Sequence, residues 1–97
     1  MMVVIYGDIR VRAEKLAEIA ALAGPFVAEV HKEAGCLAYE LSWDAADPCR
    51  LLLLEHWADD AAYQAHRGQP HVAAWAKAIT AAAETKLATT KLNATPR

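Results

Sequence analysis

The side chain of His66 is the strongest candidate for acid–base chemistry in this sequence. Histidine titrates near pH 6.5, so it can accept and release protons near neutral pH. Tyr63 lies three residues earlier, on the same face of a predicted helix, and Trp57 offers an indole N–H to a substrate oxygen. The structural alternatives are a helix-capping His66, a packing Tyr63 and a Trp57 that fills the core.

Further candidates lie on neighbouring predicted elements. His71 follows a proline at a helix start and faces either a cavity mouth or the adjacent loop. Trp75 lies four residues on, shares its face and is a candidate cavity wall. Tyr39 alternates with polar residues along a predicted strand and is also a candidate. Glu55 has the strand parity of Trp57, and we expect it to have a structural role.

The sequence predicts neither a metal site nor a bound cofactor. The spacing of His56, His66 and His71 fits no ligand set, and no carboxylate pair stands in ligand register with them. The chain has no phosphate loop, nucleotide fingerprint or nucleophile elbow.

The first half of the chain predicts a strand, a helix and a hairpin. Residues 2–11 alternate with period two, as in a strand, and residues 13–34 have helical spacing. Pro25 should kink or split that helix, and Gly35 suits its end. Strands are predicted at 37–44 and 51–57, with residues 44–49 as the loop between them.

The second half predicts a split helix and a last strand. Asp59 or Asp60 caps a short helix that ends at His66, and Pro70 starts another that extends to Ala83. Residues 85–93 read as the final strand. The order βαββαβ is that of a ferredoxin-like α+β fold, and residues 1–97 form a single domain.

The run from Leu51 to Leu54 predicts a homodimer. Consecutive leucines in a strand imply that both faces of the sheet are covered, and a chain of 97 residues has helices for only one face. A second copy, stacked sheet to sheet, would cover the other face, which also carries His56. An alanine-rich composition is the alternative reason for the 56% hydrophobic content.

The charge and the N-terminal sequence limit which binding partners and which cellular compartment we expect. The net charge of −2, with no basic stripe, argues against nucleic acid and anionic membrane surfaces. No signal peptide or membrane-length apolar run is present. Cys36 and Cys49 fall at opposite ends of the predicted hairpin, too far apart for a disulfide. We therefore expect a cytoplasmic protein with free thiols.

Three short segments resemble motifs of the antibiotic biosynthesis monooxygenase family. Residues 33–39 (EAGCLAY) are similar to its E-x-G-C-x-x-Y turn, and residues 55–59 (EHWAD) to its E-x-W-x-D strand end. Residues 62–66 (AYQAH), followed by Pro70 and His71, resemble its helical A-x-x-x-H-x-x-x-P-H segment. The three occur in the family's order, and the resemblance covers about residues 2–93.

The resemblance implies a dimeric α+β barrel with a cavity in each subunit, and a cofactor-free monooxygenase acting on a small phenolic or hydroquinone-type aromatic. It implies that His66, Trp57 and Tyr63 are catalytic. The substrate-binding residues expected beside them are His71, Trp75, Tyr39 and Leu53.

The sequence departs from anthrone-oxidising relatives at two positions. Leu53 stands where they carry an asparagine, and Ala76 where they carry an arginine. Two other functions therefore stay open: a non-enzymatic ligand-binding or stress-response module, and a cofactor-free isomerase or decarboxylase with His66 as base.

Overall fold

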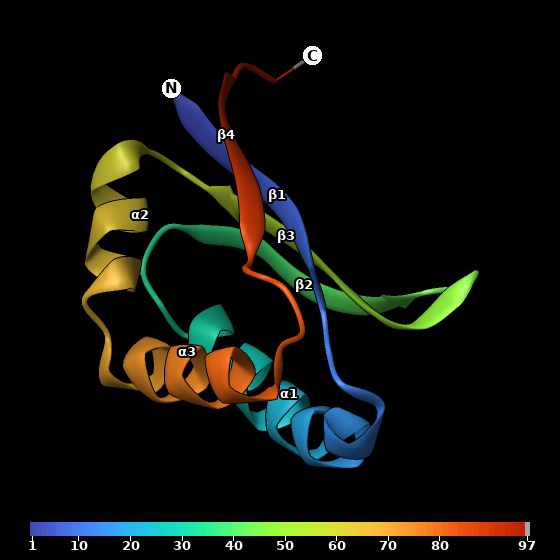
Figure 1. The fold of residues 1–97 in the computed structure, drawn as a ribbon. Helices are drawn as coiled ribbons and strands as arrows, with labels where there is room; N and C mark the ends of the chain where they lie inside the picture. The colour runs from blue at the N-terminus through green and yellow to red at the C-terminus, as the bar shows by residue number, and fades with distance from the viewer. Residues whose placement is uncertain (97) are drawn as a thin grey trace.

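The computed structural model describes residues 1–96 and has the predicted ferredoxin-like α+β architecture (Figure 1). Its elements follow in the order β1 (Met2–Arg10), a 3-10 turn (Ala13–Lys15), α1 (Leu16–His31), β2 (Cys36–Asp44), β3 (Asp47–Trp57), α2 (Asp60–Arg67), α3 (Pro70–Ala82) and β4 (Ala88–Ala94). The βαββαβ order is thus confirmed, with its second helical segment divided into α2 and α3.

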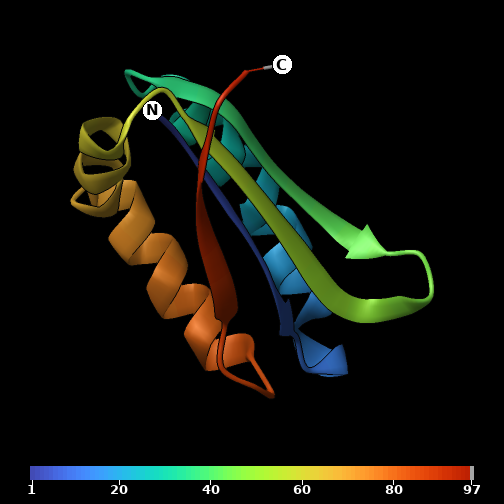
Figure 2. The ribbon, with the colours of Figure 1, turned by 90° about the horizontal axis from the view of Figure 1, so that it is seen from above.

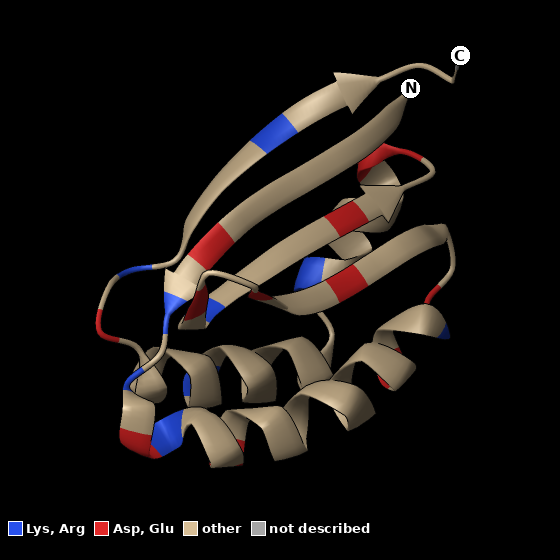
Figure 3. Cartoon of the chain, turned by 90° about the vertical axis from the view of Figure 1, so that its right-hand side faces the viewer, with Lys and Arg blue, Asp and Glu red and all other residues tan. Residues whose placement is uncertain are grey.

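The strands form one antiparallel sheet with the order β2-β3-β1-β4. The helices all lie on one side of this sheet, and its other side is open (Figures 2 and 3). The register places Glu55 of β3 beside Ile5 of β1 and Tyr39 of β2. Side chains at paired positions share a face, so these three point together toward the helices.

Two clusters of buried side chains fill the space between sheet and helices. The first lies near the end of β3 and the second near the end of β1. Their buried members are Val3, Ile5, Phe26, Val30, Tyr39 and Trp57 in the first, and Ile9, Val11, Ile19, Leu51, Ile79 and Ala82 in the second. A cavity, described below, separates the sheet from α3.

Of the two outcomes expected at Pro25, a kink or a split of the first helix, the structure excludes the split. Helix α1 continues through Pro25 from Leu16 to His31. Proline removes one backbone hydrogen bond from the helix interior. Phe26 and Val30 are buried on the same helix, one turn apart, and their burial outweighs that loss.

The hairpin between β2 and β3 is tighter than predicted. β3 begins at Asp47, so residues 44–49 are not a loop, and Asp44 Oδ1 accepts a hydrogen bond from the Ala46 N–H in the turn. A bulge between Cys36 and Ala38 turns Leu37 away from the Tyr39 face, contrary to the strict alternation predicted there, and leaves Leu37 53% exposed.

The face of the sheet opposite the helices carries uncovered apolar side chains. Tyr6, Leu54 and Leu92 are 49%, 39% and 49% exposed, and the register places Tyr6 beside Leu54. Leu92 pairs with Val4 on the same face. We call Val4, Tyr6, Leu54 and Leu92 the open-face patch.

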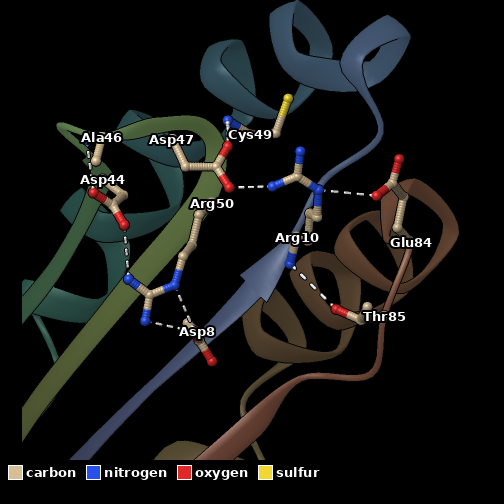
Figure 4. Close-up of polar contacts among 9 residues, drawn as sticks. All are labelled: Asp8, Arg10, Asp44, Ala46, Asp47, Cys49, Arg50, Glu84 and Thr85. Carbon is tan, nitrogen blue, oxygen red and sulfur yellow. Dashed lines mark hydrogen bonds and ion pairs between the residues drawn. The ribbon is translucent and has the colours of Figure 1, made fainter.

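Ion pairs gather where β1 meets the β2–β3 turn (Figure 4). Arg10 pairs with Asp47 at the turn and with Glu84, which follows α3. Arg50 pairs with Asp8 at 2.7 Å and with Asp44 at 2.8 Å. Arg10 therefore joins the hairpin tip to the connection between α3 and β4.

Within residues 1–96, no helix has the length and apolar character needed to cross a membrane.

Candidate active site

A cavity of about 680 Å³ lies between the sheet and the helices α2 and α3. Such a volume falls within the range of about 300–1,000 Å³ that is typical of small-molecule sites. The strands contribute mostly apolar side chains to it, including Ile5, Leu41, Leu51 and Leu53, and α3 contributes Val72, Trp75 and Ile79. Residues 83–87, between α3 and β4, also border the cavity.

Helix α2 places His66 against the buried end of the cavity. The carboxylate of Asp59 caps this helix by accepting a hydrogen bond from the Ala62 N–H at 2.8 Å. His66 lies near the other end of α2, is only 4% exposed and lines the cavity. Its ring centroid lies 4.6 Å from that of Trp57 and 5.5 Å from that of Tyr39.

Two buried carboxylates flank the His66 ring. Its Nδ1 lies 3.0 Å from Glu33 Oε2, and its Nε2 lies 3.6 Å from Glu55 Oε1. The Nδ1 distance is that of a hydrogen bond, in which the imidazole N–H donates to the Glu33 carboxylate. The side chains of Glu33, His66 and Glu55 are 9%, 5% and 7% exposed, so water screens these contacts weakly.

Glu33 also accepts a hydrogen bond from His71, whose Nε2 lies 2.7 Å from Glu33 Oε2. One carboxylate thus fixes imidazoles from both α2 and α3. Glu33 follows α1, and Gly35 with a φ of +79° lies just beyond it. A Cβ at Gly35 would lie 2.5 Å from the Ala62 Cβ, so this glycine lets the Glu33 turn approach α2 closely.

At the other end of this polar chain, Trp57 Nε1 donates a hydrogen bond of 3.0 Å to Glu55 Oε1. Burial of Glu55 raises the pKa of its carboxyl above the ordinary value; the Trp57 hydrogen bond and His66 act in the opposite direction, and Glu33 adds to the increase. The chain His71–Glu33–His66–Glu55–Trp57 therefore joins α3, α2 and β3.

Tyr39 lies beside Glu55 in the sheet, and its ring is 4% exposed. Burial, followed by the negative charges of Glu55 and Glu33, raises the pKa of the Tyr39 phenol far above its ordinary value. Tyr39 therefore stays protonated, and its hydroxyl keeps a proton to donate. Phe26 packs edge-on against Tyr39 and stacks on Trp75 at 4.9 Å, so the aromatic wall is rigid.

The structure brings five of the seven predicted site residues to the cavity wall: His66, Tyr63, Trp75, Tyr39 and Leu53. The other two, Trp57 and His71, are not among the lining residues. Trp57 is fully buried and its indole N–H is engaged by Glu55, while His71 contacts Glu33. Both therefore hold neighbouring site residues in place without lining the cavity themselves.

Sequence reasoning missed the importance of two carboxylates. Glu33 lies inside the first motif of the resemblance but is not among the predicted site residues, and Glu55 is expected only to have a structural role. Glu55 instead accepts from an indole and faces the cavity. Both carboxylates belong to short motifs that also contain a candidate aromatic, and that co-occurrence was the available signal.

The fold and cavity define a class: a ferredoxin-like α+β domain with a partly open cavity between its sheet and its helices. Within that class, the chain belongs to the antibiotic biosynthesis monooxygenase family, whose model matches residues 2–78.

Solved structures agree with this family assignment. The chain is similar to a structure described as an antibiotic biosynthesis monooxygenase, with 27% identity, a TM-score of 0.89 and coverage of 99% of this chain and 100% of that one. A Deinococcus radiodurans protein with the same family name gives 28% identity and a TM-score of 0.90, covering 98% and 94% of the two chains. Rv0793 from Mycobacterium tuberculosis shares the fold, with 23% identity, a TM-score of 0.90 and coverage of 100% and 98%.

Among curated proteins, the chain is similar to an uncharacterised protein of Synechocystis, with 30% identity over 69 residues. The match covers 71% of this chain and 47% of that protein, so it spans about half the length of the relative.

Proposed function

We propose that this protein is a cofactor-independent monooxygenase that oxidises a small phenolic or hydroquinone-type aromatic in its cavity. The observation that carries the proposal is an apolar cavity of about 680 Å³ with aromatic walls and a buried Glu–His–Glu group at one end. Family membership supports the monooxygenase class, and the cavity chemistry supports the kind of substrate.

The substrate itself supplies the electrons in this reaction. A hydroquinone loses a proton, and its anion passes an electron to O₂. One oxygen atom then bonds to a ring carbon, the other leaves as water, and the product is the hydroxylated quinone. Hydroquinone and O₂ together balance hydroxyquinone and water, so no external reductant is needed. The protein holds the anion, excludes water and moves the proton.

The cavity residues suit these tasks. Trp75 and Leu53 provide flat apolar surface, and the hydroxyls of Tyr39 and Tyr63 are donors for substrate oxygens. Tyr63 is further fixed by Lys91, whose Nζ lies 5.1 Å from its ring centroid. His66 and the carboxylates beside it provide groups that can accept the proton lost by the substrate.

The direct test is O₂ uptake with a menadiol-like hydroquinone, measured above its spontaneous oxidation, together with label incorporation from isotopically labelled O₂. We expect His66→Ala and Trp57→Phe to lower the enzymatic rate at least tenfold. Lys77→Ala, at an exposed position on α3 outside the cavity lining, is the control and should retain the rate. Unlabelled product, or O₂ uptake that does not scale with protein concentration, would contradict the proposal.

A ligand-binding module without turnover is the second candidate. It is favoured by the engagement of His66, which has a carboxylate near each of its ring nitrogens. It predicts a thermal shift with phenols but no O₂ consumption. A cofactor-free isomerase would convert a cyclic enol without any change in mass, which product mass spectrometry distinguishes from oxygenation.

The proposed working unit is a homodimer. The open-face patch leaves Tyr6, Leu54 and Leu92 39–49% exposed in the single chain, and a second copy stacked on this face would bury them.

Cys36 and Cys49 are both free, which supports a reducing compartment such as the cytoplasm.

A further inference from the structure

We infer that Glu55, rather than His66, takes the proton from a phenolic ligand, and that Tyr39 donates a hydrogen bond to the resulting oxyanion. Glu33, His66 and Trp57 are then positioning residues that hold Glu55 and tune its basicity. This inference rests on the proposed function for the class of ligand, but it does not require reaction with O₂.

The contacts of His66 argue against direct contact between its ring and the ligand. Its Nδ1 is committed to Glu33 at 3.0 Å, and its Nε2 faces Glu55 Oε1 at 3.6 Å. A ligand hydroxyl in the cavity has access to the neighbouring carboxylate without displacing either of these contacts.

Glu55 has one engaged oxygen and one free oxygen. Oε1 accepts from Trp57 Nε1 and lies nearest to His66 Nε2. Among residues 1–96, Oε2 has no hydrogen-bond partner, and the only fully buried side-chain nitrogen or oxygen without one is Arg12 Nε. Glu55 lines the cavity, so Oε2 is an acceptor that remains accessible there.

Tyr39 has the complementary property. Its hydroxyl also lacks a partner within residues 1–96 and is not fully buried, since Arg12 Nε alone meets that condition. Tyr39 and Glu55 are register partners on β2 and β3 and both line the cavity. A ligand O–H that donates to Glu55 Oε2 can therefore accept from the Tyr39 O–H at the same time.

The proton step balances within this group. The ligand O–H bond breaks, the proton bonds to Glu55 Oε2, and the charge moves from the carboxylate to the ligand oxygen with no electron transfer. The titratable groups that face Glu55 are Glu33 from the turn after α1, His66 from α2, and Tyr39 and Cys36 from β2. Because burial disfavours the ionised form of Glu55, this carboxylate is a stronger base than an exposed one.

The test uses a nitrophenol under argon, because the visible absorbance of its anion reports the ionisation of the bound ligand. At a pH one unit below the solution pKa of the probe, we expect the wild-type protein to bind it largely as the anion. Glu55→Gln should bind the neutral form and lose at least tenfold of the anion signal. Glu18→Gln, at an exposed position on α1, is the matched control and should behave as wild type.

Two further variants separate roles. Tyr39→Phe should keep the proton transfer but bind the anion several-fold more weakly. Glu55→Asp retains a carboxylate and should recover part of the anion signal, which covers the case in which Glu55→Gln fails to fold.

Three results would overturn the inference. The first is wild-type protein that binds only the neutral probe. The second is a folded Glu55→Gln variant that keeps the full anion signal. The third is the absence of any phenol binding, which would also overturn the proposed substrate class. Anion formation without O₂ uptake would support the role of Glu55 and contradict only the monooxygenase proposal.

Discussion

At the residue scale, burial of the Glu55 carboxylate lowers the stability of the fold when this group ionises, and the same burial makes the carboxylate a stronger base. Its folded pKa is raised by burial, above the value of about 4.3 for an exposed glutamate. Stability from this group is therefore fully present below about pH 4.3 and is lost as pH rises through the folded pKa. A carboxyl group whose ionisation opposes folding is typical of functional sites.

We therefore predict that Glu55→Gln removes this pH dependence. The stability of the variant relative to wild type should rise between about pH 4.3 and neutrality, since glutamine cannot ionise. Urea unfolding at several pH values measures the difference. Glu18→Gln should show no such trend, and a wild-type-like pH slope in Glu55→Gln would show that another group controls it.

Glu33 gives a second prediction at this scale. Glu33→Gln should lower the free energy of unfolding by about 1–3 kcal/mol, because two imidazoles lose a charged acceptor in a buried setting. Glu29→Gln, at an exposed position on α1, is the control and should change stability by less than about 0.5 kcal/mol. Equal losses of unfolding free energy in the two variants would contradict the stabilising role assigned to Glu33.

The residue types of the site were predictable, but their partners were only partly so. Strand and helix periodicity brought Tyr63, His66 and Trp75 to one side of the sheet, as the structure has them. The partnership of Glu33 with His66 spans 33 residues of sequence and depends on a glycine turn, so no local pattern reveals it. Contacts of this kind are set by tertiary packing.

At the element scale, the turn before β2 determines where α2 sits. Gly35→Ala should lower the unfolding free energy by about 1–3 kcal/mol, because the backbone there has a φ of +79° and the new Cβ would meet Ala62. Gly24→Ala is the contrasting case: apart from its chain neighbours and the backbone of its own helix, nothing lies within 4 Å of its Cβ position. The helix propensity gained with alanine is opposed by the ring of the following Pro25, so this variant should change stability by less than about 1 kcal/mol.

Thermal and urea unfolding of the two alanine variants measures this contrast. In addition, Gly35→Ala should weaken nitrophenol binding, because displacement of α2 moves His66, whereas Gly24→Ala should not. A neutral Gly35→Ala would mean that the turn has room to relax.

Element order was predictable and element boundaries were less so. Alternation and helical spacing predicted β1, β2 and the helices, because burial distinguishes the two sides of those elements. The run of leucines predicted β3, and residue composition predicted β4. The fate of Pro25 depended on the competition between one lost hydrogen bond and burial of Phe26, which sequence alone does not weigh. The start of β3 at Asp47 depended on a side-chain turn that pairs Asp44 with Ala46.

At the scale of the whole molecule, the open-face patch makes a prediction about assembly. Wild-type protein should sediment as a dimer at micromolar concentration, and Leu54→Lys should sediment as a monomer, because a charge in the stacked interface is costly to bury. Leu22→Lys, at a 42% exposed position on α1, is the matched control and should stay dimeric. A monomeric wild-type protein would contradict the stacking proposal.

We predict that the ion pairs of Arg10 make ligand entry into the cavity depend on ionic strength. Arg10 links the hairpin tip to Glu84, and residues 84–87 border the cavity. These side chains are 31–48% exposed, and the screening length of water falls from about 30 Å at 0.01 M salt to about 3 Å at 1 M. Added salt should therefore weaken the Arg10 ion pairs. Ligand association and dissociation should then both accelerate with ionic strength, whereas the contacts of the buried carboxylates should not change.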